Sequence, residues 1–257
     1  MKKTAIFLFL LTTLSCSTDI KKTQQKLDQN IASNYVQKVE NGVISVEEEN
    51  PYHLVDVQSL NANILIDLKY TGTDNFLGER LYYIIDKAYL QRDVAQRLSR
   101  VQEFLSKTHP GYRLLIYDAL RPVSVQKKMW DALDTLPISQ RVKFVSNPKN
   151  LSLHNLGAAI DLTIVNQQGL PLDMGAGFDD IRQIAYPSME QSFLKSGQLS
   201  VQQIENRKIL RTAMQSQSFR QLQTEWWHYN ACSREEAKQK YTVIYNESQL
   251  KQINSKN

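Results

Sequence analysis

The chain has 257 residues, of which 42% are hydrophobic and 22% are charged, an ordinary composition for a globular protein with a substantial core. Its formal net charge of +5 is modest for this length, and the lysines and arginines are scattered among acidic residues. Because no basic run is interleaved with aromatic residues, this composition argues against nucleic acid as a partner and favours a mildly basic, solvated surface.

The N-terminus has the pattern of an export signal. Lys2 and Lys3 precede the apolar stretch 5–11, which is too short to span a bilayer as a permanent helix. Cys16 follows a small residue, as in bacterial lipoprotein signals, where the cysteine is lipidated and becomes the mature N-terminus. We therefore expect a signal over 1–16 and a periplasmic protein held to the membrane by its lipid alone, in preference to a soluble periplasmic or secreted protein.

The following residues differ in composition from the rest of the chain. Residues 17–50 are rich in Lys, Gln, Asn, Ser and Glu and predict a flexible tether. From there we expect a domain over 51–240 and a polar C-terminal tail over 241–257. Lipidation of Cys16 would leave Cys232 without a partner for a disulfide, and we favour a buried, inert thiol there over a metal ligand.

Hydrophobic patterns within residues 51–240 predict both strands and helices. Alternating apolar residues predict a strand over 63–70, and apolar residues at spacings of three and four predict a helix over 90–105. Other patterns predict strands at 112–117, 158–165 and 224–229, helices at 122–136 and 201–217, and a peripheral helix or frayed segment from Ser233 onward. This irregular alternation indicates a single α+β domain of about 190 residues.

Two of the four histidines occur in contexts that suit a metal site. In the predicted strand 158–165 the apolar residues share one face, so that Asp161 points to the other face, and Gly157 allows a sharp turn after His154. Taken alone, these two residues are better read as a loop histidine and an ordinary polar-face aspartate.

Glu225 and His228 make a metal site the better interpretation of His154 and Asp161. With His154 and Asp161 they offer two imidazoles, one carboxylate ligand and a further carboxylate as a base, which is what a hydrolytic zinc site requires. Their spacing of three places them on one face of a helical turn but on opposite faces of an ideal strand, so a strand here would need a bulge or a loop.

Arg121 lies at a predicted strand-to-helix junction, where functional residues often occur. It could stabilise the oxyanion that forms when water attacks a carbonyl. The alternative is a surface arginine paired with Asp118.

Together these motifs resemble the D-alanyl-D-alanine dipeptidases, the vancomycin-resistance type of the M15 zinc peptidases. The strongest matches are Ser-x-His-x-x-Gly-x-Ala-Ile-Asp-Leu-Thr at 152–163 and Glu-Trp-Trp-His-Tyr at 225–229. Weaker matches lie around 69–78, 118–122, 174–179 and 206–211, in the same order as in the family. Leu156 and the Ala158-Ala159 pair depart locally from the family pattern.

The resemblance implies a fold, a cofactor and residue roles. The fold is a central, mainly antiparallel sheet flanked by helices, as in hedgehog-like and D,D-peptidase domains, and the cofactor is one Zn²⁺ per chain. The implied zinc ligands are His154, Asp161 and His228, the base is Glu225 and the transition-state arginine is Arg121. Ser152, Asp179 and Tyr70 match residues that hold the dipeptide, with Asp179 receiving its ammonium group.

The implied reaction is zinc-dependent hydrolysis of D-Ala-D-Ala, with Glu225 activating the attacking water. Resistance dipeptidases act in the cytoplasm, so the predicted export signal leaves the physiological role open and makes peptidoglycan fragments possible partners. One alternative is an M15 carboxypeptidase that trims peptidoglycan stem peptides. Another is a non-catalytic zinc module that binds the cell wall.

Overall fold

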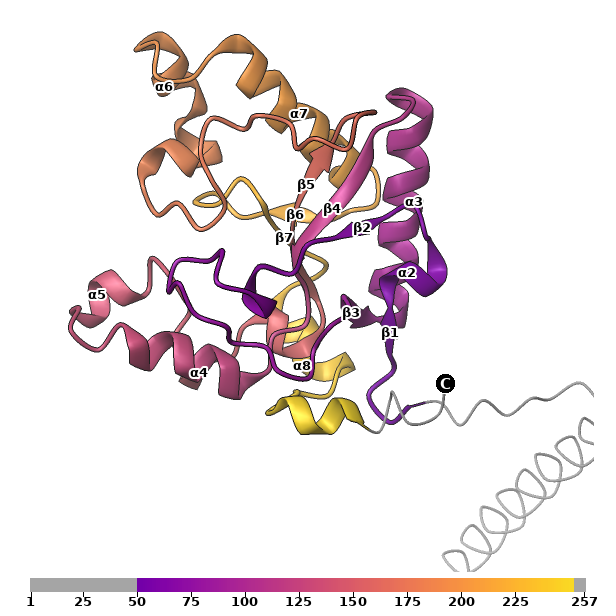
Figure 1. The fold of residues 1–257 in the computed structure, drawn as a ribbon, viewed down its shortest axis with the longest axis vertical. Coiled ribbons are helices and arrows are strands. Elements are labelled where there is room, and N and C mark those ends of the chain that lie inside the picture. The colour runs from indigo at the N-terminus through magenta and orange to yellow at the C-terminus, as the bar shows by residue number, and fades with distance from the viewer. Residues whose placement is uncertain (1–49, 252–257) are drawn as a thin grey trace, which may run out of the picture. The chain divides into compact units, whose positions relative to one another are not determined.

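A five-stranded sheet lies at the centre of residues 50–251, the part of the chain that this computed structural model describes (Figure 1). Its strands, in spatial order, are β2 (Leu65–Ile66), β4 (Arg113–Asp118), β5 (Ala159–Val165), β7 (His228–Asn230) and β6 (Arg220–Gln221). The β2–β4 pair is parallel and the other pairs are antiparallel. This arrangement confirms the predicted α+β domain with a mainly antiparallel sheet. The predicted signal, Cys16 and residues 17–49 of the tether lie outside the described residues.

Strand β5 is the middle strand, and all seven of its residues are buried. Its apolar residues Ile160, Leu162 and Ile164 belong to the main hydrophobic cluster. Because successive side chains of a strand point to opposite faces, Asp161 and Thr163 lie on the other side of the sheet from these residues. The sequence pattern had predicted this division, and it leaves one face of β5 free for polar chemistry.

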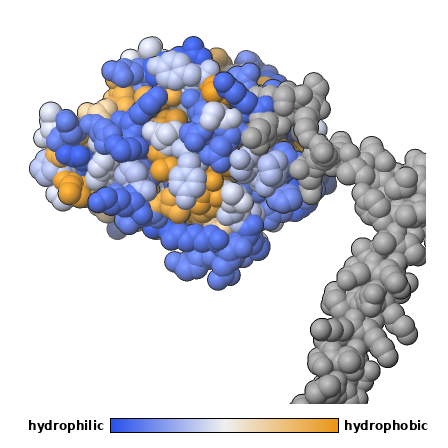
Figure 2. All heavy atoms as spheres, turned by 90° about the horizontal axis from the view of Figure 1, so that it is seen from below, coloured by the Kyte–Doolittle hydropathy of each residue, from blue (hydrophilic) through white to orange (hydrophobic). Residues whose placement is uncertain are grey.

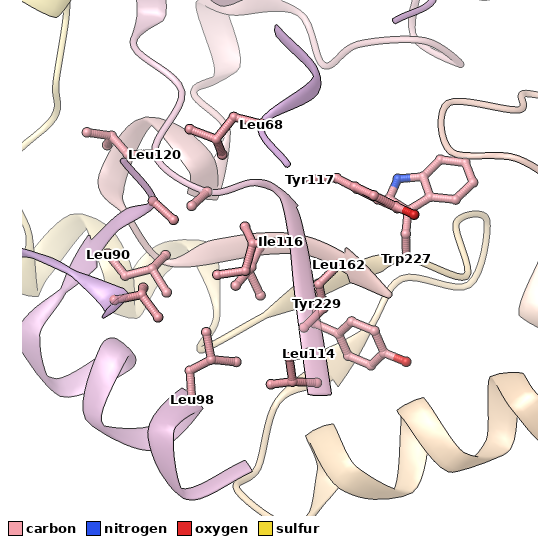
Figure 3. Close-up of a cluster of buried hydrophobic side chains, with 14 of the residues drawn as sticks. Leu68, Leu90, Leu98, Leu114, Ile116, Tyr117, Leu120, Leu162, Trp227 and Tyr229 are labelled. Carbon is pink, nitrogen blue, oxygen red and sulfur yellow. The ribbon is translucent and has the colours of Figure 1, made fainter. Parts of the chain in front are cut away.

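Helix α3 (Arg92–Thr108) packs against the sheet through the apolar residues that predicted it, Val94, Leu98, Val101 and Leu105, all of them fully buried. Figure 3 shows Leu98 in one cluster with Leu114 and Ile116 of β4. Full burial of each such side chain contributes roughly 1.5–3 kcal/mol. Leu90, expected at the start of this helix, instead lies in β3 (Tyr89–Gln91), which pairs with β1 (Leu54–Asp56) in a separate two-stranded sheet.

The other helices surround the sheet. They are α2 (Val57–Leu60), α4 (Val123–Ala132), α5 (Ile138–Arg141), α6 (Glu190–Lys195), α7 (Val201–Gln215) and α8 (Arg234–Lys240), with 3₁₀ segments η1 (Lys69–Thr71), η2 (Pro148–Asn150), η3 (Leu153–Leu156), η4 (Gln183–Ala185), η5 (Pro187–Met189) and η6 (Glu247–Leu250). Within residues 50–251, none of the helices has the length and hydropathy needed to cross a membrane. Figure 2 shows one face of the domain, where apolar patches are interspersed with hydrophilic side chains.

Several elements are shorter than predicted. The strand expected over 63–70 is reduced to β2, because the Leu68 carbonyl accepts hydrogen bonds from the backbone N–H and hydroxyl of Thr71 and so closes a turn. The helix expected over 122–136 ends at Ala132, and the chain continues in turns before Pro137.

The C-terminal residues also differ from expectation, because the predicted tail 241–257 begins too early. Ile244 and Leu250 are buried in the main cluster. The Ile244 N–H donates to the Asn155 carbonyl, and the Val123 N–H donates to the Ile244 carbonyl, both at 2.9 Å. The apolar residues of this segment stand among polar ones without a clear period, which was too weak a signal in the sequence, yet Ile244 attaches the segment to η3 and to the start of α4.

We therefore expect Ile244→Ala to lower the free energy of unfolding by about 2–5 kcal/mol, because it leaves a cavity in the core. Thr242→Ala is the matched control, since Thr242 is exposed two residues away, and should change stability by less than about 0.5 kcal/mol. Urea denaturation of both variants at equal zinc concentration measures the difference. Equal stability of the two variants would show that this segment is a loosely attached tail.

Candidate metal centre

Three polar side chains form a row across the central strands. Asp118 of β4 lies opposite Asp161 of β5, and Asp161 lies opposite His228 of β7. Directly opposed residues of antiparallel strands project from the same face. The β4–β5 register shifts between Ile116 and Asp118, which leaves Tyr117 as the extra residue of a bulge. The bulge is what brings Asp118 into line with Asp161.

His154 reaches this row from the short segment η3. The Ser152 hydroxyl accepts a hydrogen bond from the His154 N–H at 3.3 Å, and the Asn155 side-chain oxygen accepts one from the Ser152 N–H at 2.7 Å. This capping box starts the segment. Gly157 ends it with a φ of +62°, and a Cβ atom there would lie 2.8 Å from Leu54 Cδ2. The local sequence therefore fixes where the His154 ring points.

The three residues predicted as ligands converge on one point. His154 Nε2 lies 3.2 Å from His228 Nδ1 and 3.5 Å from Asp161 Oδ2, and His228 Nδ1 lies 2.9 Å from Asp161 Oδ1. All three side chains are largely buried. The Asp161–His228 contact follows directly from their cross-strand pairing.

Hydrogen bonds on the far sides of both rings determine which nitrogens face this point. His154 Nδ1 lies 2.6 Å from the Ala119 carbonyl, which can only accept, so Nδ1 carries the proton and Nε2 carries a lone pair. His228 Nε2 similarly donates to the Asn230 side-chain oxygen at 2.9 Å, so Nδ1 is the nitrogen that faces Asp161. When a metal replaces the proton on Nδ1, two neutral imidazoles and a carboxylate would direct lone pairs at a common centre. This donor set suits a zinc ion with one coordination position open.

The electrostatics of the centre favour a cation. Burial alone would raise the pKa of Asp161, but His154 and His228 hold it well below its usual range. Burial opposes the charged form of His228, yet its hydrogen bond to Asp161 and the charge of that carboxylate raise its pKa to about 9. A metal ion at the centre would take the place of the proton between His228 Nδ1 and Asp161.

Arg121 follows β4 and balances the charge of the two aspartates. Its Nε donates to Asp118 Oδ2 at 2.8 Å, and its Nη2 lies 2.6 Å from the same oxygen and 3.3 Å from Asp161 Oδ2. Its guanidinium lies 5.2 Å from the centre of the Tyr70 ring. The pairing with Asp118 that the alternative reading expected is present, but Arg121 is only 8% exposed and is not a surface residue. Nη1 takes no part in these contacts.

Every predicted site residue within the described part of the chain lines one cavity of about 280 Å³. These residues are Tyr70, Arg121, Ser152, His154, Asp161, Asp179, Glu225 and His228. Ligand pockets are commonly about 300–1,000 Å³, so this one suits a small molecule.

Glu225 lies in the loop between β6 and β7, three residues before the first residue of β7. The predicted strand over 224–229 therefore begins only at His228. Because Glu225 lies in the loop, its spacing of three residues from His228 does not conflict with strand geometry. Glu225 Oε2 lies 3.6 Å from His228 Nδ1. Burial raises the pKa of Glu225, although the nearby His228 acts in the opposite direction. The carboxylate is thus beside the metal centre without belonging to the three-residue cluster.

Asp179 lies elsewhere on the cavity wall, in a left-handed backbone conformation with φ +61°. The Tyr70 hydroxyl donates to its Oδ2 at 3.0 Å. Burial raises the pKa of Asp179 to about 8, despite the opposing charge of Arg121. Among the described residues no lysine, arginine or histidine forms an ion pair with it. A cationic group of a ligand beside Asp179 would lower this pKa and hold the side chain as a carboxylate, so the position suits an ammonium group.

Sequence reasoning missed several residues that support the centre. Asn230 holds His228, and the strand period of two would have placed both on one face. The Tyr82 hydroxyl donates to Asp118 Oδ1 at 2.6 Å, and the Ala119 carbonyl orients His154, but nothing in the sequence signals either contact. Cys232 is buried, as expected, in a smaller apolar cluster and does not line the cavity.

We expect Asn230→Ala to weaken zinc binding by about 10–100-fold, because the His228 ring loses the acceptor that fixes its tautomer. Asn150→Ala is a suitable control, since Asn150 is exposed and does not line the cavity. Competition with a chromogenic chelator measures both affinities. Unchanged affinity in Asn230→Ala would mean that this hydrogen bond does not prepare His228 for a metal.

Comparisons with known proteins agree with this geometry. A family model described as Peptidase_M15, D-ala-D-ala dipeptidase, matches residues 50–248. The D-alanyl-D-alanine dipeptidase of Escherichia coli (strain K12) is 34% identical over 179 residues, which cover 68% of this chain and 83% of that protein. The enzyme of the same name from Enterococcus faecium is 29% identical over 177 residues, covering 63% of this chain and 83% of that protein.

Among solved structures, the vancomycin resistance D,D-pentapeptidase VanY in complex with Zn(II) aligns with a TM-score of 0.32 at 14% identity. The alignment covers 66% of this chain and 88% of that one. The family model and the Escherichia coli relative carry the assignment, and the residues matched by the family model include all those that line the cavity. This chain belongs to the D-Ala-D-Ala dipeptidase family of M15 peptidases.

Proposed function

We propose that this chain is a zinc-dependent dipeptidase that hydrolyses D-alanyl-D-alanine to two molecules of D-alanine. The observation that carries the proposal is the convergence of His154 Nε2, Asp161 and His228 Nδ1 beside Glu225, within a small cavity that also contains Asp179. The names of the relatives from Escherichia coli and Enterococcus faecium support the choice of substrate.

In this proposal His154, Asp161 and His228 hold one zinc ion per chain. When bound, zinc supplies a Lewis acid that polarises a carbonyl group and acidifies water. Glu225 takes a proton from the attacking water as its oxygen bonds to the peptide carbon. Glu225 then delivers that proton to the amide nitrogen, so that the C–N bond breaks and the second D-alanine leaves as an amine. The free Nη1 of Arg121 is available to stabilise negative charge on the carbonyl oxygen.

Asp179 explains why the substrate would be a dipeptide. Its carboxylate, held by Tyr70, pairs with the free ammonium group of the first residue. Ser152 contacts the substrate where it lines the same cavity, in addition to capping η3. An ammonium site on the wall of a cavity of about 280 Å³ favours a short substrate over a peptidoglycan stem. These features favour the dipeptidase over the carboxypeptidase alternative.

Hydrolysis of a panel of peptides tests the proposal. The zinc-loaded protein should cleave D-Ala-D-Ala, and a chelator should abolish the activity until zinc is restored. Acetylation of the substrate amine should raise KM, because Asp179 would lose its cationic partner. The panel also includes L,D- and L,L-dipeptides and a stem pentapeptide. Exclusive cleavage of the pentapeptide would favour the carboxypeptidase, and zinc binding without any hydrolysis would favour the non-catalytic module.

We also propose that the protein is exported to the periplasm and lipidated on Cys16, so that the domain acts near the membrane on dipeptides or other fragments derived from peptidoglycan. The signal pattern over 1–16 supports this location. Mass spectrometry of the mature N-terminus tests it. A diacylated Cys16 is the expected result, and an unmodified chain that starts after Cys16 would exclude the lipid anchor.

A further inference from the structure

The loop that carries Asp179 is attached to α7 by buried hydrogen bonds. The Arg207 side chain is fully buried, and its Nε and Nη2 donate to the carbonyls of Met174 and Ile184 at 2.7 and 2.8 Å. Asn206 Nδ2 donates to the Asp173 carbonyl at 2.8 Å. These carbonyls lie on both sides of Asp179 in the chain, so α7 holds both ends of its loop.

The same helix also reaches the loop that carries Glu225. Both carboxylate oxygens of Glu190 accept hydrogen bonds from Arg211 Nη2, at 2.6 and 2.8 Å, and Arg211 Nε donates to Gln221 Oε1 at 2.7 Å. Gln221 Nε2 in turn donates to the carbonyl of Trp226 at 2.8 Å. This series of hydrogen bonds therefore ends at Trp226, the residue next to Glu225.

Glu190 connects the two sets of contacts. Its Oε1 lies 3.6 Å from Nη1 of the buried Arg207, while Arg211 donates to both of its oxygens. A second connection joins the two loops directly, because Trp226 Nε1 donates to the Ala176 carbonyl at 3.0 Å. The loops of Asp179 and Glu225 therefore share one rigid support although they are far apart in the sequence.

The energetics make a purely structural role a poor explanation for this cluster. Glu190 and Arg207 are buried while Arg211 is partly exposed, and burying charged groups carries a desolvation cost that their mutual attraction must offset. Apolar side chains of similar volume often give equal or greater stability. What they could not provide is a set of donors directed at the backbone carbonyls of two irregular loops.

We propose that Asn206, Arg207, Glu190, Arg211 and Gln221 are positioning residues that fix the separation between Asp179 and Glu225, and thereby direct cleavage to the first peptide bond after the substrate ammonium. This inference rests on the proposed function, because it assigns the substrate ammonium to Asp179 and the base to Glu225. The group that binds the substrate ammonium and the base that acts on the peptide bond are then held by different contacts of the same cluster.

Two variants test separately the contacts that hold the Asp179 loop and those that hold the Glu225 loop. Asn206→Ala loosens the Asp179 loop, and we expect KM for D-Ala-D-Ala to rise about fivefold with kcat nearly unchanged. Gln221→Ala loosens the Glu225 loop, and we expect kcat to fall about tenfold with KM nearly unchanged, since a displacement of the base acts on the reacting centre. In Asn206→Ala the cleavage of D-Ala-D-Ala-D-Ala at its second peptide bond should increase relative to cleavage at its first. Lys208→Gln is the matched control, because Lys208 is an exposed cation on the same helix whose only ion pair within residues 50–251 is with Glu205.

Hydrogen exchange of the zinc-loaded full chain gives a readout that does not depend on turnover. Exchange should quicken over 173–184 in Asn206→Ala and over 222–227 in Gln221→Ala, with neither region changed in Lys208→Gln. Exchange that quickens equally in both loops, or kcat and KM that change together with thermal stability, would overturn the positioning role. Should the wild-type chain hydrolyse no dipeptide, the proposed function and the choice of the first peptide bond fail, while the exchange pattern still decides whether the cluster positions each loop.

Discussion

Glu225→Ala should lower kcat for D-Ala-D-Ala by about a hundredfold to ten-thousandfold, the range typical of losing a general base. Zinc should remain bound, because the three convergent ligand atoms belong to His154, Asp161 and His228 and not to Glu225. Steady-state kinetics together with metal analysis of the same sample separate these two effects. The loss should appear mainly in kcat, since Glu225 acts on the proton of the attacking water.

Glu235→Ala serves as the control for this experiment, because Glu235 is an exposed carboxylate on α8 that does not line the cavity. Its kinetics should match the wild type. Turnover of Glu225→Ala within a few-fold of the wild type would remove Glu225 from the role of base. Loss of zinc together with loss of activity would instead make Glu225 a ligand.

His154→Ala should abolish both zinc binding at stoichiometric concentrations and hydrolysis. The reason is that Nε2 is one of three donors, and the remaining two cannot form the three-ligand set of a catalytic zinc site. Metal analysis after dialysis should show far less than one zinc per chain. His109→Ala is the matched control, since His109 is located at the end of α3 and does not line the cavity.

Thermal unfolding adds a second measurement to the His154 experiment. Zinc should raise the Tm of the wild type and of His109→Ala, because a ligand that binds the native state stabilises it. It should raise the Tm of His154→Ala far less. Equal zinc stabilisation in all three proteins would place the metal at another site.

The fold class and the separation of polar from apolar faces in β5 could be predicted from local sequence. The period of two around Ile160, Leu162 and Ile164 is a short-range property that the final sheet preserves. The same holds for α3, whose buried residues repeat at helical spacing. Errors arose where tertiary contacts decided the outcome, as when the turn at Thr71 shortened β2 and when buried Ile244 attached a polar segment to the core.

The candidate site shows the same limit. Residue types and motif resemblance brought His154, Asp161, Glu225 and His228 together, but the sequence could not show how Glu225 and His228 approach one point. The answer depends on a loop that ends just before His228 and on the pairing of β7 with β5. Strand pairing and register are long-range properties, and no local pattern encodes the contacts of Ala119 or Tyr82 with the site.

The row of Asp118, Asp161 and His228 also makes the site a test of correct folding. A slip of one residue between β5 and β7 would turn one of the two ligands to the opposite face of the sheet. A slipped chain could retain much of its secondary structure and still lack a zinc site. After refolding, the fraction of chains that bind zinc should therefore report how many have paired these strands correctly, a quantity that circular dichroism would overestimate.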